Sequence, residues 1–168
     1  MISVPRSVLA LTAALLVSVA PNPGTGQQRT KMPETKSATP YHPGLGELMT
    51  AFVQPRHIKL GLAGNEQNWP YAAYELGELA ETFDDVATLV PKHDNLPIPE
   101  MIAATVKQPM AALDGAIKAK DATAFTKAYA DLTAACNACH QSAGHPMIVI
   151  EVPTASPFPD QDFRPPRK

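Results

Sequence analysis

Apolar residues in the middle of the chain recur at steps of three and four positions, which is the spacing of an amphipathic α-helix. Four such segments follow one another, at 44–64, 69–90, 99–118 and 122–143. The connections between them are short, and short connections place consecutive helices antiparallel. The pattern therefore predicts an all-α fold, an antiparallel four-helix bundle with up-down-up-down connections.

Prolines and capping residues refine the ends of these helices. Pro55 lies inside the first apolar pattern, so we expect either a kink near that residue or a helix that begins only at Gln54. Asn68 is the expected N-cap of the second helix, and Asp121 is the expected N-cap of the fourth. Pro109 is expected to kink the third helix.

The two ends of the chain differ from this middle because most of the 18 prolines lie in them. Such clustering predicts extended segments, a disordered linker at 21–43 and a tail at 145–168. Within the tail, residues 147–152 form an apolar, β-prone run that would invite aggregation if it were exposed. We expect this run to pack on the bundle or on a second subunit.

The first 20 residues have the three parts of a secretory signal peptide. A short segment with one basic residue, Met1 to Arg6, precedes an apolar run at 8–17, and small residues follow at 18–20. This pattern predicts export to the periplasm, with an uncleaved N-terminal anchor as the alternative. The remaining sequence contains no apolar run long enough to span a membrane, so no span is expected after signal removal.

Charge and composition restrict the class of protein. Removal of residues 1–20 takes away one charge, Arg6, and leaves 13 basic and 16 acidic residues, a formal charge of −3. This balance lacks the basic footprint of a nucleic-acid-binding protein. The acidic run from Glu75 to Asp85 is interpreted as a solvated helix face, with a docking face for a basic partner as the alternative. No Gly-rich phosphate loop or paired-carboxylate arrangement stands out, so we do not expect an enzyme.

Cys136, Cys139 and His140 form the pattern C-x-x-C-H, the attachment sequence of a c-type haem. The two thiols would add to the haem vinyl groups, and their spacing puts them on one face of a helix. His140 can offer an imidazole nitrogen to the iron as proximal ligand. These are the only two cysteines, too few by themselves for a thiolate zinc site, and no βαβ pattern indicates a thioredoxin-like dithiol. The sequence therefore predicts one covalently attached haem c.

A helical bundle with C-x-x-C-H in its last helix resembles the class II cytochromes c, the cytochrome c prime type, over residues 44–144. Two blocks, 56–76 and 148–153, also look like a family of small exported bacterial monohaem cytochromes of uncertain function. The resemblance implies that Arg56, with His57 as a further candidate, contacts a haem propionate. It also implies a homodimer as a candidate assembly.

The position of the iron along the bundle indicates which residue could bind its distal side. The first and fourth helices should run antiparallel, and we take Gly64 as level with Asp121. The side chain of His140 leans toward the N-terminus of its helix. In this register the iron lies level with Met49, which is the favoured distal ligand.

Other distal arrangements compete with Met49. His57 is the stronger ligand by chemistry, but it lies about 12 Å further along the helix at about 1.5 Å per residue. A third arrangement is a five-coordinate iron that faces apolar residues such as Phe52 or Val53. Among the other residues of suitable type, His42 and His93 are interpreted as solvated, and Met101 and Met110 are interpreted as core residues. His145 is interpreted as a helix-exit residue, with an iron ligand as the alternative.

Two functions follow from these alternatives. A methionine-ligated haem would make the protein an electron carrier, and its partner would be a redox protein whose identity the sequence does not give. An open or displaceable distal position would make it a protein that binds or senses NO or CO. A third idea is a partner subunit of a redox complex, with the β-prone tail as the contact.

Overall fold

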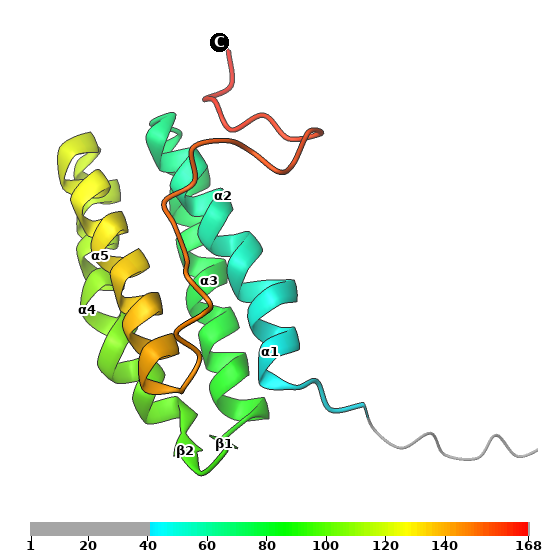
Figure 1. Ribbon diagram of the computed structural model, residues 1–168. Coiled ribbons are helices and arrows are strands. Elements are labelled where there is room, and N and C mark those ends of the chain that lie inside the picture. Colours follow the sequence, from blue (N-terminus) through cyan, green and yellow to red (C-terminus); the bar gives the residue numbers. More distant parts are fainter. Residues whose placement is uncertain (1–40, 168) are drawn as a thin grey trace, which may run out of the picture. The chain divides into compact units, whose positions relative to one another are not determined.

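The computed structural model describes residues 41–167, and this part of the chain forms a bundle of four helices (Figure 1). The first helix consists of three consecutive segments, α1 (Leu45–Leu48), η1 (Met49–Val53) and α2 (Gln54–Asn65). The other three are α3 (Trp69–Leu89), α4 (Ile98–Ala119) and α5 (Ala122–Ser142). The all-α bundle is thus confirmed, with helix bounds close to those expected. The predicted signal peptide and residues 21–40 of the predicted linker lie outside the described residues.

Each helix packs against the next along the chain, and α2 packs against α5 to complete the bundle. The link between α3 and α4 is a short antiparallel hairpin of β1 (Lys92–His93) and β2 (Leu96–Pro97). Its turn residues Asp94 and Asn95 have φ angles of 48° and 67°, as a type I′ hairpin turn requires. Asp and Asn tolerate this left-handed conformation better than most residues.

The fourth helix begins and ends as its sequence predicts. The Asp121 carboxylate Oδ1 accepts hydrogen bonds from the backbone N–H groups of Thr123 and Ala124, at 2.9 and 3.0 Å. These bonds satisfy two donors that would otherwise lack partners at the helix start. Gly144 follows the last turn with a φ of 79°, a left-handed conformation that glycine adopts without strain.

The first helix runs through Pro55 without a break, because Val53 and Gln54 before it have helical dihedral angles and α2 continues to Asn65. Residues Met49–Val53 instead form a π-helical turn, in which the N–H of Gln54 donates to the carbonyl of Met49. Proline has no N–H to donate to the residue four positions earlier, so the wider turn lies where the regular ladder is already interrupted. Such turns within α-helices are frequent at functional sites.

The residues after α5 are extended and run back along the bundle between α5 and α2 (Figure 1). We call residues 145–167 the C-terminal tail. Asn68, at the start of α3, does not cap that helix as expected. Its side-chain amide donates to the carbonyl oxygens of Phe163 and Arg164, at 3.2 and 3.1 Å. Asn68 therefore binds the C-terminal tail, although local sequence predicted that it would cap α3.

The contact between α2 and α5 determines their register. Gly61 lies against the ring of Tyr129, and Gly64 lies against the ring of Phe125, with no room for a Cβ at either glycine. Gly64 is thus level with Phe125 and not with Asp121, so the assumed register was wrong by one helical turn. Large side chains on α5 fill the space that the glycines leave.

Gly64→Ala is expected to destabilise the protein, because the added methyl group meets the Phe125 ring. Overpacking of this kind costs about 1–3 kcal/mol, more than the ~0.5–1 kcal/mol that alanine contributes to a helix. The matched control is Gly77→Ala on the exposed side of α3, where a Cβ meets nothing within 4 Å and should stabilise. Chemical denaturation measures both. Equal stabilisation by the two substitutions would contradict the packing described here.

Candidate functional site

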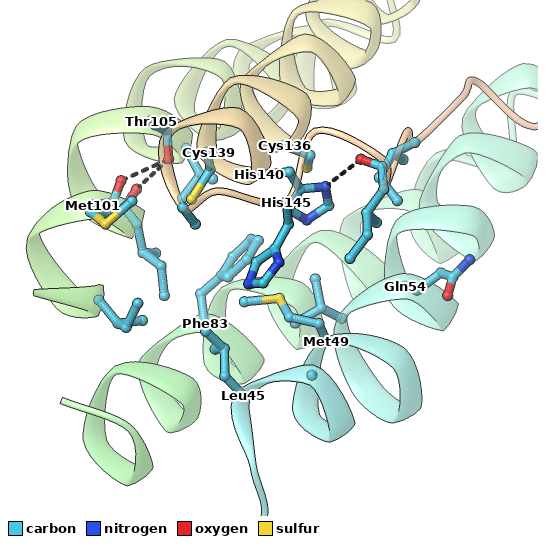
Figure 2. Close-up of a pocket in the computed structure, with 18 of the residues that line it drawn as sticks. Leu45, Met49, Gln54, Phe83, Met101, Thr105, Cys136, Cys139, His140 and His145 are labelled. Carbon is cyan, nitrogen blue, oxygen red and sulfur yellow. Dashed lines mark hydrogen bonds between the residues drawn. The ribbon is translucent and has the colours of Figure 1, made fainter. Parts of the chain in front are cut away.

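A cavity of about 360 Å³ lies at the end of the bundle that holds the last turns of α5. This volume is within the roughly 300–1,000 Å³ of small-molecule and cofactor sites. Its walls come from all four helices and from the start of the C-terminal tail (Figure 2). The side chains that enclose it are mainly apolar and include Leu45, Val53, Phe83, Ile98, Ile102 and Val106.

Cys136, Cys139 and His140 all line this cavity from α5. The two thiols are not joined in a disulfide and are partly buried. Burial raises the pKa of Cys136 to about 11 and also raises that of Cys139. Both are therefore protonated near neutral pH, unlike the reactive thiolates of dithiol enzymes. The structure thus brings the three residues of the motif to one apolar space, as the helical spacing predicted.

The tail orients the imidazole of His140. His140 Nδ1 lies 3.0 Å from the carbonyl oxygen of Ile148 (Figure 2). A carbonyl can only accept, so Nδ1 carries the proton and donates it. The lone pair of the neutral ring is then on Nε2. Histidines that bind metals commonly donate their second ring N–H to a backbone carbonyl in this way.

Met49 and Val53 face the His140 imidazole from the π-helical turn, and both line the cavity. Figure 2 shows Met49 below His140, with the side chains of Phe83 and His145 between them. The corrected register moves the level expected for an iron on His140 by one turn, from Met49 toward Val53. Met49 remains on the cavity wall, but the helix register no longer favours it over an apolar distal side.

His57 also borders the cavity, but its ring is engaged elsewhere. The side chain is buried, with Nε2 3.0 Å from the Thr133 hydroxyl and Nδ1 3.0 Å from the Tyr129 hydroxyl. The His57 and Tyr129 rings also stack, with centroids 4.7 Å apart. Each ring nitrogen of His57 thus has a hydroxyl group of α5 within hydrogen-bond distance, and its role as a distal ligand stays a prediction. In this structure His57 serves the packing of α2 on α5.

Arg56 does not line the cavity. Its guanidinium pairs with Glu75 at 3.2 Å and with Glu78 at 2.7 Å, both on α3. Glu75 is only 1% exposed, so its placement on a solvated face was wrong. A buried carboxylate needs such a partner, and Arg56 provides it. The structure thus shows Arg56 paired with two α3 carboxylates, and its contact with a haem propionate stays a prediction.

Two further histidines border the cavity: one was interpreted as solvated and the other as a helix-exit residue. His93 from the hairpin and His145 from the tail are partly buried, with ring centroids 6.2 Å apart. Met101 and Met110 both pack against the core, as expected, and Met101 also lines the cavity. His145 follows the haem motif closely, and that proximity was the one sequence signal available. No local pattern marked His93, because the hairpin brings it to the site.

The observed residues fit a covalently held haem. Two unbridged thiols and an imidazole with its Nε2 lone pair available share one apolar cavity. Within residues 41–167 no group of three or more His, Cys, Asp or Glu side chains is arranged to hold a metal ion. In the same part of the chain, no helix combines the length and apolar character needed to cross a membrane.

Stability is expected to depend on pH through His57. Burial lowers the pKa of His57 from 6.5 to about 4, so between these values the unfolded chain binds a proton that the folded chain does not. The free energy of unfolding should therefore be highest above pH 6.5 and fall by roughly 3 kcal/mol as the pH drops toward 4. Urea denaturation across this range measures it. His57→Gln should flatten the dependence, and His42→Gln, at an exposed position, is the control.

Comparison with protein-family models, curated proteins and solved structures gave no match for this chain. The residues of the cavity and the motif that contributes to it therefore carry the information about function. The bundle by itself is shared by proteins of many functions.

Proposed function

We propose that this chain is an exported c-type cytochrome with one covalently attached haem, and that it carries electrons. The observation that carries the proposal is the C-x-x-C-H motif, with both thiols and the imidazole on one apolar cavity. The bond from His140 Nδ1 to Ile148 supports it, because it leaves Nε2 for the iron. The predicted signal peptide at 1–20 supports export to the periplasm.

Each residue has a separate role in this proposal. Cys136 and Cys139 would hold the haem through thioether bonds, and His140 would bind the iron. The haem, when bound, supplies one-electron chemistry. Apolar walls such as Val53 and Phe83 exclude water from the site, and exclusion of water is one way in which a protein tunes a redox potential.

Met49 is the proposed distal ligand for the electron carrier. Its thioether lines the cavity wall opposite α5, and a methionine ligand raises the potential of a haem. An open distal position is the alternative, because the corrected register no longer favours Met49 over Val53, and Val53 has no atom that can bind iron. That arrangement would bind NO or CO, with sensing or gas binding as the function.

The partner of the electron carrier is proposed to be a redox protein. Neither a nucleic-acid partner nor catalysis of a substrate reaction belongs to this proposal, because the charge balance and the cavity residues support neither. The only support for a homodimer is the resemblance to the class II cytochromes c.

Expression in the presence of a haem-attachment system should yield protein whose mass is increased by one haem. Cys136→Ala or Cys139→Ala should leave one thioether bond, and the double substitution should abolish covalent haem. Haem staining after denaturing electrophoresis and a pyridine haemochrome spectrum measure this. Ser142→Ala is the control, on the same helix but outside the cavity lining. A wild-type protein that matures without covalent haem would contradict the proposal.

An optical spectrum of the oxidised protein distinguishes the two functions. The electron carrier should show the methionine-to-iron charge-transfer band, which Met49→Ala should abolish. His57→Gln should keep the band, because His57 is engaged with Thr133 and Tyr129. A high-spin spectrum that shifts on addition of CO or NO would instead refute the carrier and support the gas-binding protein.

A further inference from the structure

We infer that the C-terminal tail contributes to the proximal side of the iron site, the side on which His140 would bind. In this inference Asn137 holds the tail so that the Ile148 carbonyl accepts the Nδ1 proton of His140. The tail thereby sets the orientation and basicity of the proximal ligand. The inference depends on the proposed haem and deepens it by naming what tunes the iron.

Asn137 holds the tail backbone at two points. Its Oδ1 accepts a hydrogen bond from the N–H of Ile150 at 2.7 Å, and its Nδ2 donates to the carbonyl of the same residue at 2.9 Å. Two bonds to one peptide residue define both its position and its direction. Asn137 lies between the two cysteines of the motif, so one helical turn carries the thiols and the attachment of the tail. Ile148, two residues before the attached residue, is then placed at His140.

Backbone bonds and alternate side chains both hold this stretch of the tail. Met147 is 75% exposed and Val149 is 66% exposed, so these side chains contribute little to its position. Ile148 and Ile150, which alternate with them, line the cavity. The backbone groups of the same two residues bond to His140 and Asn137, which supports a role for the backbone as well.

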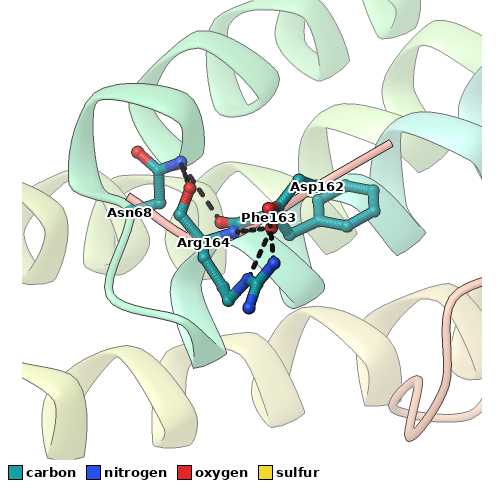
Figure 3. Close-up of polar contacts among 4 residues, drawn as sticks. All are labelled: Asn68, Asp162, Phe163 and Arg164. Carbon is teal, nitrogen blue, oxygen red and sulfur yellow. Dashed lines mark hydrogen bonds and ion pairs between the residues drawn. The ribbon is translucent and has the colours of Figure 1, made fainter. Parts of the chain in front are cut away.

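The far end of the tail has an anchor of its own. Phe163 is buried and stacks on Tyr71, with ring centroids 5.6 Å apart and planes 8° apart. Asn68 donates to the carbonyls of Phe163 and Arg164 (Figure 3). The tail is therefore held at two distant places by two asparagines. Substitution of one or the other separates the effect of the near end from that of the tail as a whole.

The hydrogen bond to Ile148 has a definite chemical consequence. A ring N–H that donates to a carbonyl makes the other ring nitrogen a stronger electron donor. A stronger donor favours oxidised iron over reduced iron and so lowers the reduction potential. Release of the tail from His140 should therefore raise the potential. It should also free the ring to rotate, because the carbonyl no longer fixes its orientation.

The test uses the full-length protein with its haem and compares Asn137→Ala with Asn68→Ala. Spectroelectrochemistry measures the reduction potential, and NMR of the reduced protein measures exchange of the Ile150 amide and the His140 Nδ1 proton. Asn137→Ala should speed both exchanges and raise the potential. Asn68→Ala should leave all three measurements near their wild-type values. A chain that ends at Met147 lacks the Ile148 carbonyl and should show the largest rise.

Two results would overturn the inference while the proposed haem stands. One is faster exchange of the Ile150 amide in Asn137→Ala with an unchanged potential. The other is an Ile150 amide that exchanges as slowly in Asn137→Ala as in the wild type. If Asn137→Ala does not accumulate, the reduction potential of the chain that ends at Met147 decides. A potential equal to that of the wild type would overturn the inference. Wild-type protein without covalent haem would overturn the proposed function, and the inference with it, and haem staining reveals that case.

Discussion

Helices α2 and α5 approach closely because two glycines on α2 face two aromatic rings on α5. Gly61 accommodates Tyr129, and Gly64 accommodates Phe125. Each ring occupies the volume that a Cβ would need, so one helix cannot slide along the other by a turn without a clash. This contact sets which residues of the first helix stand opposite the motif. It therefore determines whether Met49 or Val53 is level with an iron held by His140.

The buried polar groups next to this contact strengthen the same register. His57 bonds through its ring to Tyr129 and Thr133, and Tyr129 also donates to the His57 carbonyl at 2.7 Å. Buried groups of this kind require partners, and only one alignment of the helices supplies them all. His57, whose chemistry made it a candidate iron ligand, thereby helps to align the two helices. The cavity starts just beyond this network, where the π-helical turn of residues 49–53 faces the motif.

Local sequence predicted much of the bundle because local interactions determine it. Helix periodicity, the Asp121 cap and the Gly144 exit depend on residues within a few positions of one another. Asn68 shows where this reasoning fails, since its side chain had two possible partners and the distant tail supplied the one that it binds. Glu75 fails for the same reason, because its burial depends on Arg56 from another helix.

The sequence by itself determined the helices, the motif and the chemistry that Cys136, Cys139 and His140 can support, because these depend on residue type and short spacing. Only the tertiary structure decided the register of α2 on α5, the engagement of His57 and Arg56, and the approach of His93 and His145 to the cavity. It also decided that the Ile148 carbonyl meets His140. Such contacts join residues far apart in the chain, and they form only where packing and buried hydrogen bonds are satisfied together.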